Sequence, residues 1–264
     1  PRFFRKFASY SVARERRGGA EFRSRIGSNR SGQRFRSDSI MKFLALETSS
    51  ERGSLAVING SAIIERWIET PRAQTSRLLP LTKELLSEAS LSLSDLDGIA
   101  FGRGPGSFTG LRVATAIAQG IGLSAALPIL PISSLAALAQ QAYHEHGLSR
   151  VLVCVDAHMG EVYWAAFEIQ DGFAVPSLPE SLTAPQVVNW KGLEPWGAVG
   201  SGCQVYSKTL ASLLSGADQV LPGLRPRARD LFSQAKADLV AGRAQAAEQA
   251  KPAYLRDESA WKGS

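Results

Sequence analysis

The sequence predicts an α/β protein of two subdomains, each built around a mixed sheet. The first observation is a meander of three strands over residues 42–68, followed by alternating helices and strands. The second is another pair of strands, 151–156 and 161–169, which opens the second half of the chain. The repeated opening indicates an internal duplication, and it rests on the pattern of elements alone.

Residues 1–40 differ sharply in composition from the rest of the chain. They hold 11 of the 30 Lys and Arg residues but 3 of the 24 Asp and Glu, so this extension carries +8 and the remaining 224 residues carry −2. The extension has too few apolar residues to fold alone. We interpret it as a disordered, non-native segment upstream of a translation start at Met41. The alternatives are a transit peptide and a basic arm that binds RNA.

The body is predicted to divide into an N-terminal subdomain, 41–148, and a C-terminal subdomain, 149–264. In the first, strands at 42–47, 54–58 and 62–68 include an Asn59-Gly60 hairpin turn. Leucines at helical spacing predict a helix over about 76–90, with Pro80 in or near its first turn, where proline is tolerated.

The next helices alternate with short strands. We expect helices over 107–126 and 134–145, separated by a strand at 129–132. In the second subdomain, a Pro-rich loop at 176–185 and a helix near 230–241 are predicted.

A glycine-rich turn links the strand at 98–101 to the helix after it. Gly104 and Gly106 permit a tight turn and a close backbone approach, and Ser107 is a candidate N-cap. A helix start of this kind could hold a phosphate or carboxylate. Equally, a strand-turn-helix connection needs glycines without binding anything, and this turn matches neither the dinucleotide fingerprint nor a P-loop.

Two carboxylates occupy equivalent places in the two halves. Glu47 and Asp156 each end the first strand of a strand-turn-strand unit. From there a carboxylate could face a nucleotide and its metal, or it could cap the turn that comes next.

The sequence offers no clear metal or thiol site. His144 and His146 lie at i, i+2 and so point to different sides of a helix. Cys154 and Cys203 are isolated in the sequence, which favours a reducing, cytoplasmic location without a disulfide. No apolar run reaches membrane-spanning length.

Two helices carry faces suited to close packing. Leu78, Leu81 and Leu85 mark one helix, and small residues at i, i+4 and i+8 mark the next: Ala114, Ala118 and Gly122. An apolar helix of this kind should be covered on both sides. Either this protein's own sheet or a partner protein could cover that face.

Four motifs, at 41–50, 102–112, 156–164 and 254–256, resemble those of the TsaB (YeaZ) family, and the resemblance runs from residue 41 to about 262. It implies an actin/Hsp70-like (ASKHA) fold of two subdomains with no chemistry of its own. It also implies a heterodimer with TsaD through the N-terminal helices, joined by the ATPase TsaE. That complex transfers threonylcarbamoyl to adenosine 37 of tRNAs reading codons that begin with A, so tRNA is reached through the complex.

The resemblance also bears on the site residues. Catalytic relatives carry a metal-binding His-x-x-x-His pair, where this chain has Ser134 and Leu138. We therefore expect no catalytic residue, no metal, no protease site and no intrinsic cofactor, with ATP or ADP at the complex interface left open. The contact helices would present Leu78, Leu81, Leu85, Ala114, Ala118 and Gly122. The vestigial nucleotide-facing set would be Glu47, Gly104, Gly106, Ser107 and Asp156.

The same residues also allow alternatives to the scaffold role. The main one is an independent actin-like ATPase or phosphotransferase using Glu47, Asp156 and the glycine turn. Another is direct tRNA binding through residues 1–40. An exposed apolar helix pair also favours a homodimer when TsaD is missing.

Overall fold

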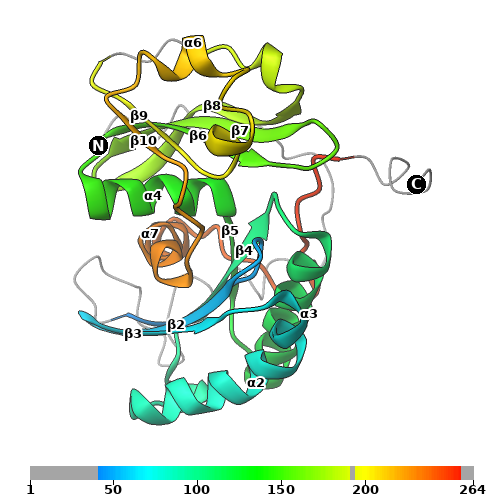
Figure 1. Ribbon diagram of the computed structural model, residues 1–264. Helices are drawn as coiled ribbons and strands as arrows, with labels where there is room; N and C mark the ends of the chain where they lie inside the picture. Colours follow the sequence, from blue (N-terminus) through cyan, green and yellow to red (C-terminus); the bar gives the residue numbers. More distant parts are fainter. Residues whose placement is uncertain (1–40, 191–193, 257–264) are drawn as a thin grey trace, which may run out of the picture.

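Two five-stranded sheets, with helices between and beside them, form the described part of the chain, residues 41–190 and 194–256 of a computed structural model (Figure 1). The predicted basic extension lies outside the described residues. Among the described residues, none of the helices combines the length and apolarity needed to cross a bilayer.

The first sheet has the strand order β3-β2-β1-β4-β5. Strand β1 pairs antiparallel with β2 and parallel with β4, while β3 and β5 complete the edges. The strands are β1 (Lys42–Glu47), β2 (Gly53–Asn59), β3 (Ala62–Ile68), β4 (Gly98–Gly104) and β5 (Ile129–Ser133). The hairpin predicted at Asn59-Gly60 is present between β2 and β3.

The second sheet repeats this topology, with the order β8-β7-β6-β9-β10 and the same parallel and antiparallel senses. Its strands are β6 (Arg150–Asp156), β7 (Val162–Gln170), β8 (Phe173–Thr183), β9 (Gly197–Val199) and β10 (Gln219–Leu221). The predicted duplication and the predicted α/β class of two mixed sheets are confirmed.

Helices α2 (Pro71–Glu88) and α3 (Phe108–Ala125) pack together over one face of the first sheet (Figure 1). The other helices are α4 (Ser134–His146), α5 (Gly202–Val205), α6 (Ala211–Leu214) and α7 (Phe232–Val240). Short 3-10 turns occur at η2 (Leu93–Asp95), η3 (Pro185–Val187), η4 (Ala228–Leu231) and η5 (Ala247–Gln249).

The two halves exchange helices across the middle of the molecule. Helix α4, from the first half, packs its buried Leu135 and Leu138 against the second sheet. Helix α7, from the second half, packs Phe232 and Leu239 against the first sheet (Figure 1). The predicted boundary after residue 148 therefore separates the strands of the two sheets but not the cores around them.

Two predictions about proline were wrong. Residues 176–183 are not a loop but belong to β8, which tolerates Pro176 and Pro179 because it lies at the edge of its sheet. Helix α2 begins at Pro71 rather than near residue 76, so Pro80 lies inside the helix and not in its first turn. Burial of the leucine face of α2 holds the helix together through Pro80.

Candidate functional site

The glycine turn is filled by this protein's own backbone. A Cβ at Gly106 would lie 2.3 Å from the Ser49 carbonyl oxygen, and one at Gly110 would lie 1.8 Å from that of Thr48. The Ser107 N–H donates to the Ser49 carbonyl oxygen at 2.7 Å. Because these glycines lack a Cβ, the backbone of the turn after β1 packs directly against them. That backbone fills the space next to the glycine turn.

Ser107 is the N-cap of α3, as predicted. Its Oγ accepts a hydrogen bond from the Gly110 N–H at 3.3 Å. Gly104 has φ +106°, a conformation that favours glycine and sets the direction in which the chain enters α3.

Glu47, at the end of β1, is completely buried. Its Oε1 accepts the Ser49 N–H at 2.7 Å, and its Oε2 accepts the Ser134 hydroxyl at 2.9 Å. A Cβ at Gly102 would lie 1.9 Å from Oε2, so the carboxylate occupies the space that a larger residue there would need. Burial raises the pKa of Glu47, and its hydrogen bonds offset part of that shift.

Asp156 occupies the equivalent place at the end of β6. Its Oδ1 accepts the His158 N–H at 3.0 Å and the Tyr206 hydroxyl at 2.9 Å. The bond to the backbone N–H two residues later matches the Glu47 to Ser49 contact. The turn-capping interpretation of both carboxylates is therefore confirmed.

The described residues do not bring together a set of candidate metal ligands. Within residues 41–190 and 194–256, no group of three His, Cys, Asp or Glu side chains could hold an ion. Ser134 is bonded to Glu47, and Leu138 is buried in the second core. His144 contacts the buried Asp230 at 3.0 Å, and Arg227 donates to the same carboxylate at 2.7 Å.

The two cysteines are not isolated in space. Cys154 and Cys203 lie in one buried cluster on one face of the second sheet. The hydrogen bond with Cys203 and burial together raise the pKa of the Cys154 thiol well above its ordinary value. Spacing in the sequence could not reveal this contact.

The six residues predicted to contact a partner lie in this protein's own interior. They are Leu78, Leu81, Leu85, Ala114, Ala118 and Gly122, and all are buried. They pack among the two helices and the first sheet, so they cannot form an external contact surface. The exposed surface of the helix pair instead includes Leu79 of α2, 50% exposed, and Leu123 of α3, 56% exposed, together with the exposed Ala116 and Gly120 of α3.

Sequence reasoning did not predict that residues 250–256, the C-terminal strap, would join the two halves. The Ala253 N–H donates to the Arg103 carbonyl oxygen at 2.7 Å. Arg256 then contacts Glu161 at 2.8 Å and donates to the Ala157 carbonyl oxygen at 2.9 Å, in the turn between β6 and β7. The Tyr-Leu-Arg motif at 254–256 was the available signal, because Arg256 is the buried anchor of the strap.

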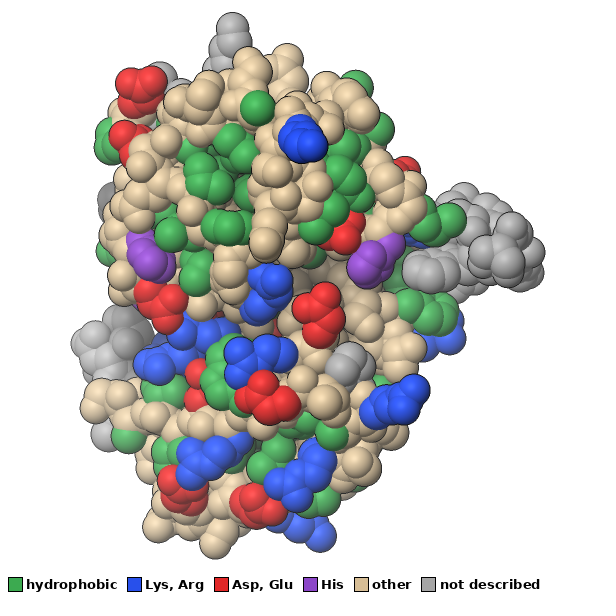
Figure 2. All heavy atoms as spheres, viewed as in Figure 1, with side chains coloured by type: hydrophobic (Ala, Val, Ile, Leu, Met, Phe, Trp, Pro, Cys, Tyr) green, Lys and Arg blue, Asp and Glu red, His purple; other side chains and the backbone are tan. Residues whose placement is uncertain are grey.

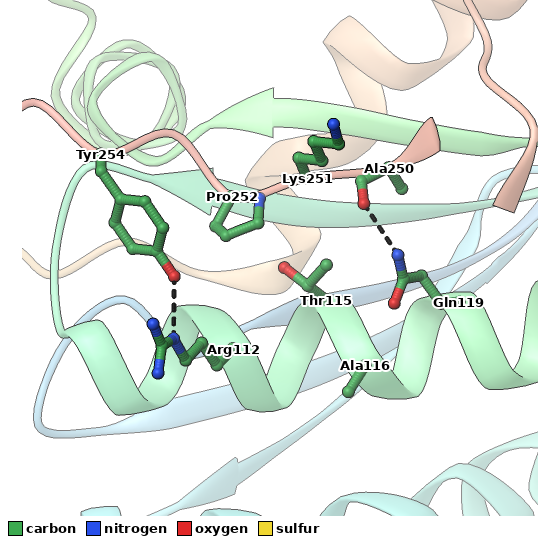
Figure 3. Close-up of a pocket in the computed structure, with 8 residues that line it drawn as sticks. All are labelled: Arg112, Thr115, Ala116, Gln119, Ala250, Lys251, Pro252 and Tyr254. Atoms are coloured by element: carbon green, nitrogen blue, oxygen red, sulfur yellow. Dashed lines mark hydrogen bonds between the residues drawn. The ribbon is translucent and has the colours of Figure 1, made fainter. Parts of the chain in front are cut away.

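An open groove of about 440 Å³ separates the strap from α3 (Figure 3). Arg112, Thr115 and Gln119 line it from the helix, and Lys251, Pro252 and Tyr254 line it from the strap. Elsewhere, Figure 2 shows basic and acidic side chains interspersed over the lower half of the visible face, without a continuous basic patch.

The fold and these turns define a class: a duplicated actin/Hsp70-like protein whose two equivalent turns are capped by its own carboxylates. Residues 69–195 match the family model of TsaD, described as tRNA N6-adenosine threonylcarbamoyltransferase.

Relatives that match most of the chain identify the family. The tRNA threonylcarbamoyladenosine biosynthesis protein TsaB of Escherichia coli is 36% identical over 84% of this chain and 97% of its own length. That of Haemophilus influenzae is 34% identical, covering 84% and 96%. The solved YeaZ structure from Pseudomonas aeruginosa superposes with a TM-score of 0.75 at 37% identity, covering 81% of this chain and all of that one. The chain belongs to the TsaB (YeaZ) family.

Proposed function

We propose that this protein acts in the biosynthesis of threonylcarbamoyladenosine in tRNA, as a non-catalytic partner of a TsaD-type transferase. The names of the Escherichia coli and Haemophilus influenzae relatives support the pathway. The match of residues 69–195 to the TsaD family supports a partner of related fold.

The observation that carries the non-catalytic role is the internal use of both turn carboxylates. Glu47 is enclosed by Ser49, Ser134 and the backbone at Gly102. A carboxylate that binds a metal-nucleotide complex needs an oxygen that faces the ligand. The turns are therefore suited to holding the fold, and the contribution to the reaction would be made by docking.

The outward face of α2 and α3 is the best candidate for the partner contact. Leu79 and Leu123 expose apolar surface there, and Ala116 and Gly120 allow a close approach. A transferase of related fold carries equivalent helices, so the two proteins could pair through matching faces around an approximate two-fold axis. The same surface supports a homodimer when the transferase is missing. Association with TsaE, ATP or ADP at the complex interface and a cytoplasmic location remain proposals from the family resemblance.

Reconstitution tests this function. The transferase from the same source, threonylcarbamoyl-adenylate, ATP and unmodified tRNA are incubated with and without the full chain, and the modified nucleoside is quantified by mass spectrometry. The expected result is that the chain alone forms no product and that the transferase forms it at least about tenfold faster when the chain is present. Equal rates with and without the chain would contradict the proposal.

A further inference from the structure

The groove between α3 and the C-terminal strap adjoins the outer face of the helix pair, because Ala116 belongs to both, but the groove also carries positive charge. Its two sides carry one cation each, Arg112 from the helix and Lys251 from the strap (Figure 3). On the strap side, Pro252 and Tyr254 supply apolar surface, and none of the described residues that line the groove is acidic. On the helix side, Thr115 and Gln119 point toward the strap, whereas Ala116 points away from it (Figure 3). The site therefore combines apolar surface on the strap with one cation on each side.

The positive charge of the groove is not neutralised within the described part of the chain. Neither Arg112 nor Lys251 forms a salt bridge with a described carboxylate. Arg112 is nevertheless held in place, because its guanidinium lies 3.7 Å from the centre of the Phe108 ring and its Nε donates to the Tyr254 hydroxyl at 3.1 Å. An oriented guanidinium loses little entropy when it binds a carboxylate.

The side of the groove formed by the strap is also fixed. Gln119 donates to the Ala250 carbonyl oxygen at 2.9 Å, and the Ala253 N–H is bonded to Arg103. These two bonds tie the strap down on both sides of Lys251 and Pro252. The groove is thus a preformed channel, which lowers the ordering cost of binding a ligand.

We infer that this groove binds an extended acidic segment of another protein, in which an apolar side chain packs against Pro252 and Tyr254 and flanking carboxylates meet Arg112 and Lys251. The charge complementarity of the two rims selects an anionic partner. The open groove, with apolar surface on the strap between two separate cations, favours a peptide chain over a compact anion. This inference does not depend on the proposed function, because it concerns the isolated chain.

Fluorescence anisotropy on the full chain tests the inference. The probe is a labelled eight-residue peptide with a central leucine flanked by Asp and Glu, compared with the same peptide carrying Lys in place of each acid. The acidic peptide should bind at least about tenfold more tightly than the basic one, and its affinity should fall as the salt concentration is raised. Equal affinity for the two peptides would overturn the inference.

Variants locate the binding. Lys251→Glu changes an exposed residue and should lower the affinity for the acidic peptide at least about tenfold. Lys208→Glu makes the same charge change in the second half of the chain, outside the groove, and should change the affinity less than about twofold. Equal losses in both variants would show attraction by overall charge and would contradict the site. Tighter binding of an RNA oligonucleotide than of the acidic peptide would contradict the choice of partner.

The segment after the strap supplies a last check. A variant ending at Arg256 should bind the acidic peptide within about twofold of the full chain. A gain of about tenfold or more would mean that the chain's own residues 257–264 fill the groove, which would overturn the assignment to another protein.

Discussion

The Oε2 atom of Glu47 accepts a hydrogen bond of 2.9 Å from the hydroxyl of Ser134, and both side chains are completely buried. This contact joins the end of β1 to the first residue of α4, the helix that crosses to the second sheet. A carboxylate at the point where the two halves meet is thus part of the structure that connects them.

The first prediction concerns pH. Burial raises the pKa of Glu47 in the folded state above its ordinary value of 4.5, so the folded protein binds more protons than the unfolded chain from that pH up to the raised pKa. The contribution of Glu47 to the free energy of unfolding therefore falls as pH rises through this window. Glu47→Gln removes the titration. In urea unfolding series upward from pH 4.5, the variant should gain stability relative to wild type as pH rises, and a constant difference would contradict this prediction.

The second prediction concerns the glycine turn and uses two glycines of the same helix. Gly110→Ala places a Cβ against the Thr48 carbonyl oxygen and should cost about 3 kcal/mol or more in the free energy of unfolding. Gly120→Ala is the control, because nothing lies within 4 Å of its Cβ, and it should stabilise α3 by about 0.5–1 kcal/mol. Chemical denaturation measures both. Similar effects in the two variants would refute the tight approach of Thr48 to α3.

The third prediction separates the core of the helix pair from its surface. Ala118→Glu buries an unpaired charge in the first core, so we expect the variant to lose several kcal/mol of stability or fail to fold. Leu123→Glu changes an exposed side chain and should shift stability by about 0.5 kcal/mol or less, yet weaken binding to the transferase at least about tenfold. Calorimetry with the purified transferase measures the second effect. A folded Leu123→Glu variant with undiminished affinity would remove this face from the proposed interface.

The fourth prediction concerns the strap. Arg256→Ala removes the contacts with Glu161 and the Ala157 carbonyl oxygen, and should cost about 2 kcal/mol and speed amide exchange over residues 250–256. Arg243→Ala breaks the surface pair with Asp238 and should cost less than about 0.5 kcal/mol. Hydrogen exchange read by mass spectrometry follows the strap directly. Unchanged exchange over 250–256 in Arg256→Ala would show that Arg256 does not anchor it.

The sheets could be predicted because their signals are local. The apolar strands on either side of the Asn59-Gly60 turn specify the hairpin of β2 and β3, and the repeated opening at residue 151 specifies the second sheet. The turn carboxylates were also found from position, since each ends the first strand of its sheet.

The features that the sequence did not predict depend on contacts between residues that are far apart in the sequence. Helical spacing identifies the apolar face of Ala114 and Ala118, but not whether this chain or another covers it. The cysteine pair and the strap escaped for the same reason, because residues 250–256 have no periodic pattern and Cys154 and Cys203 meet only in the folded chain.

The central claim is that both turn carboxylates serve the fold rather than the reaction, and the double variant Glu47→Gln with Asp156→Asn tests it most directly. The rate of threonylcarbamoyladenosine formation by the reconstituted transferase is measured at equal concentrations of folded wild-type chain and variant. We expect rates within about twofold of each other, since each carboxylate accepts hydrogen bonds from its own chain and caps a turn of the fold. A loss of about a hundredfold in a variant that still binds the transferase would contradict the claim.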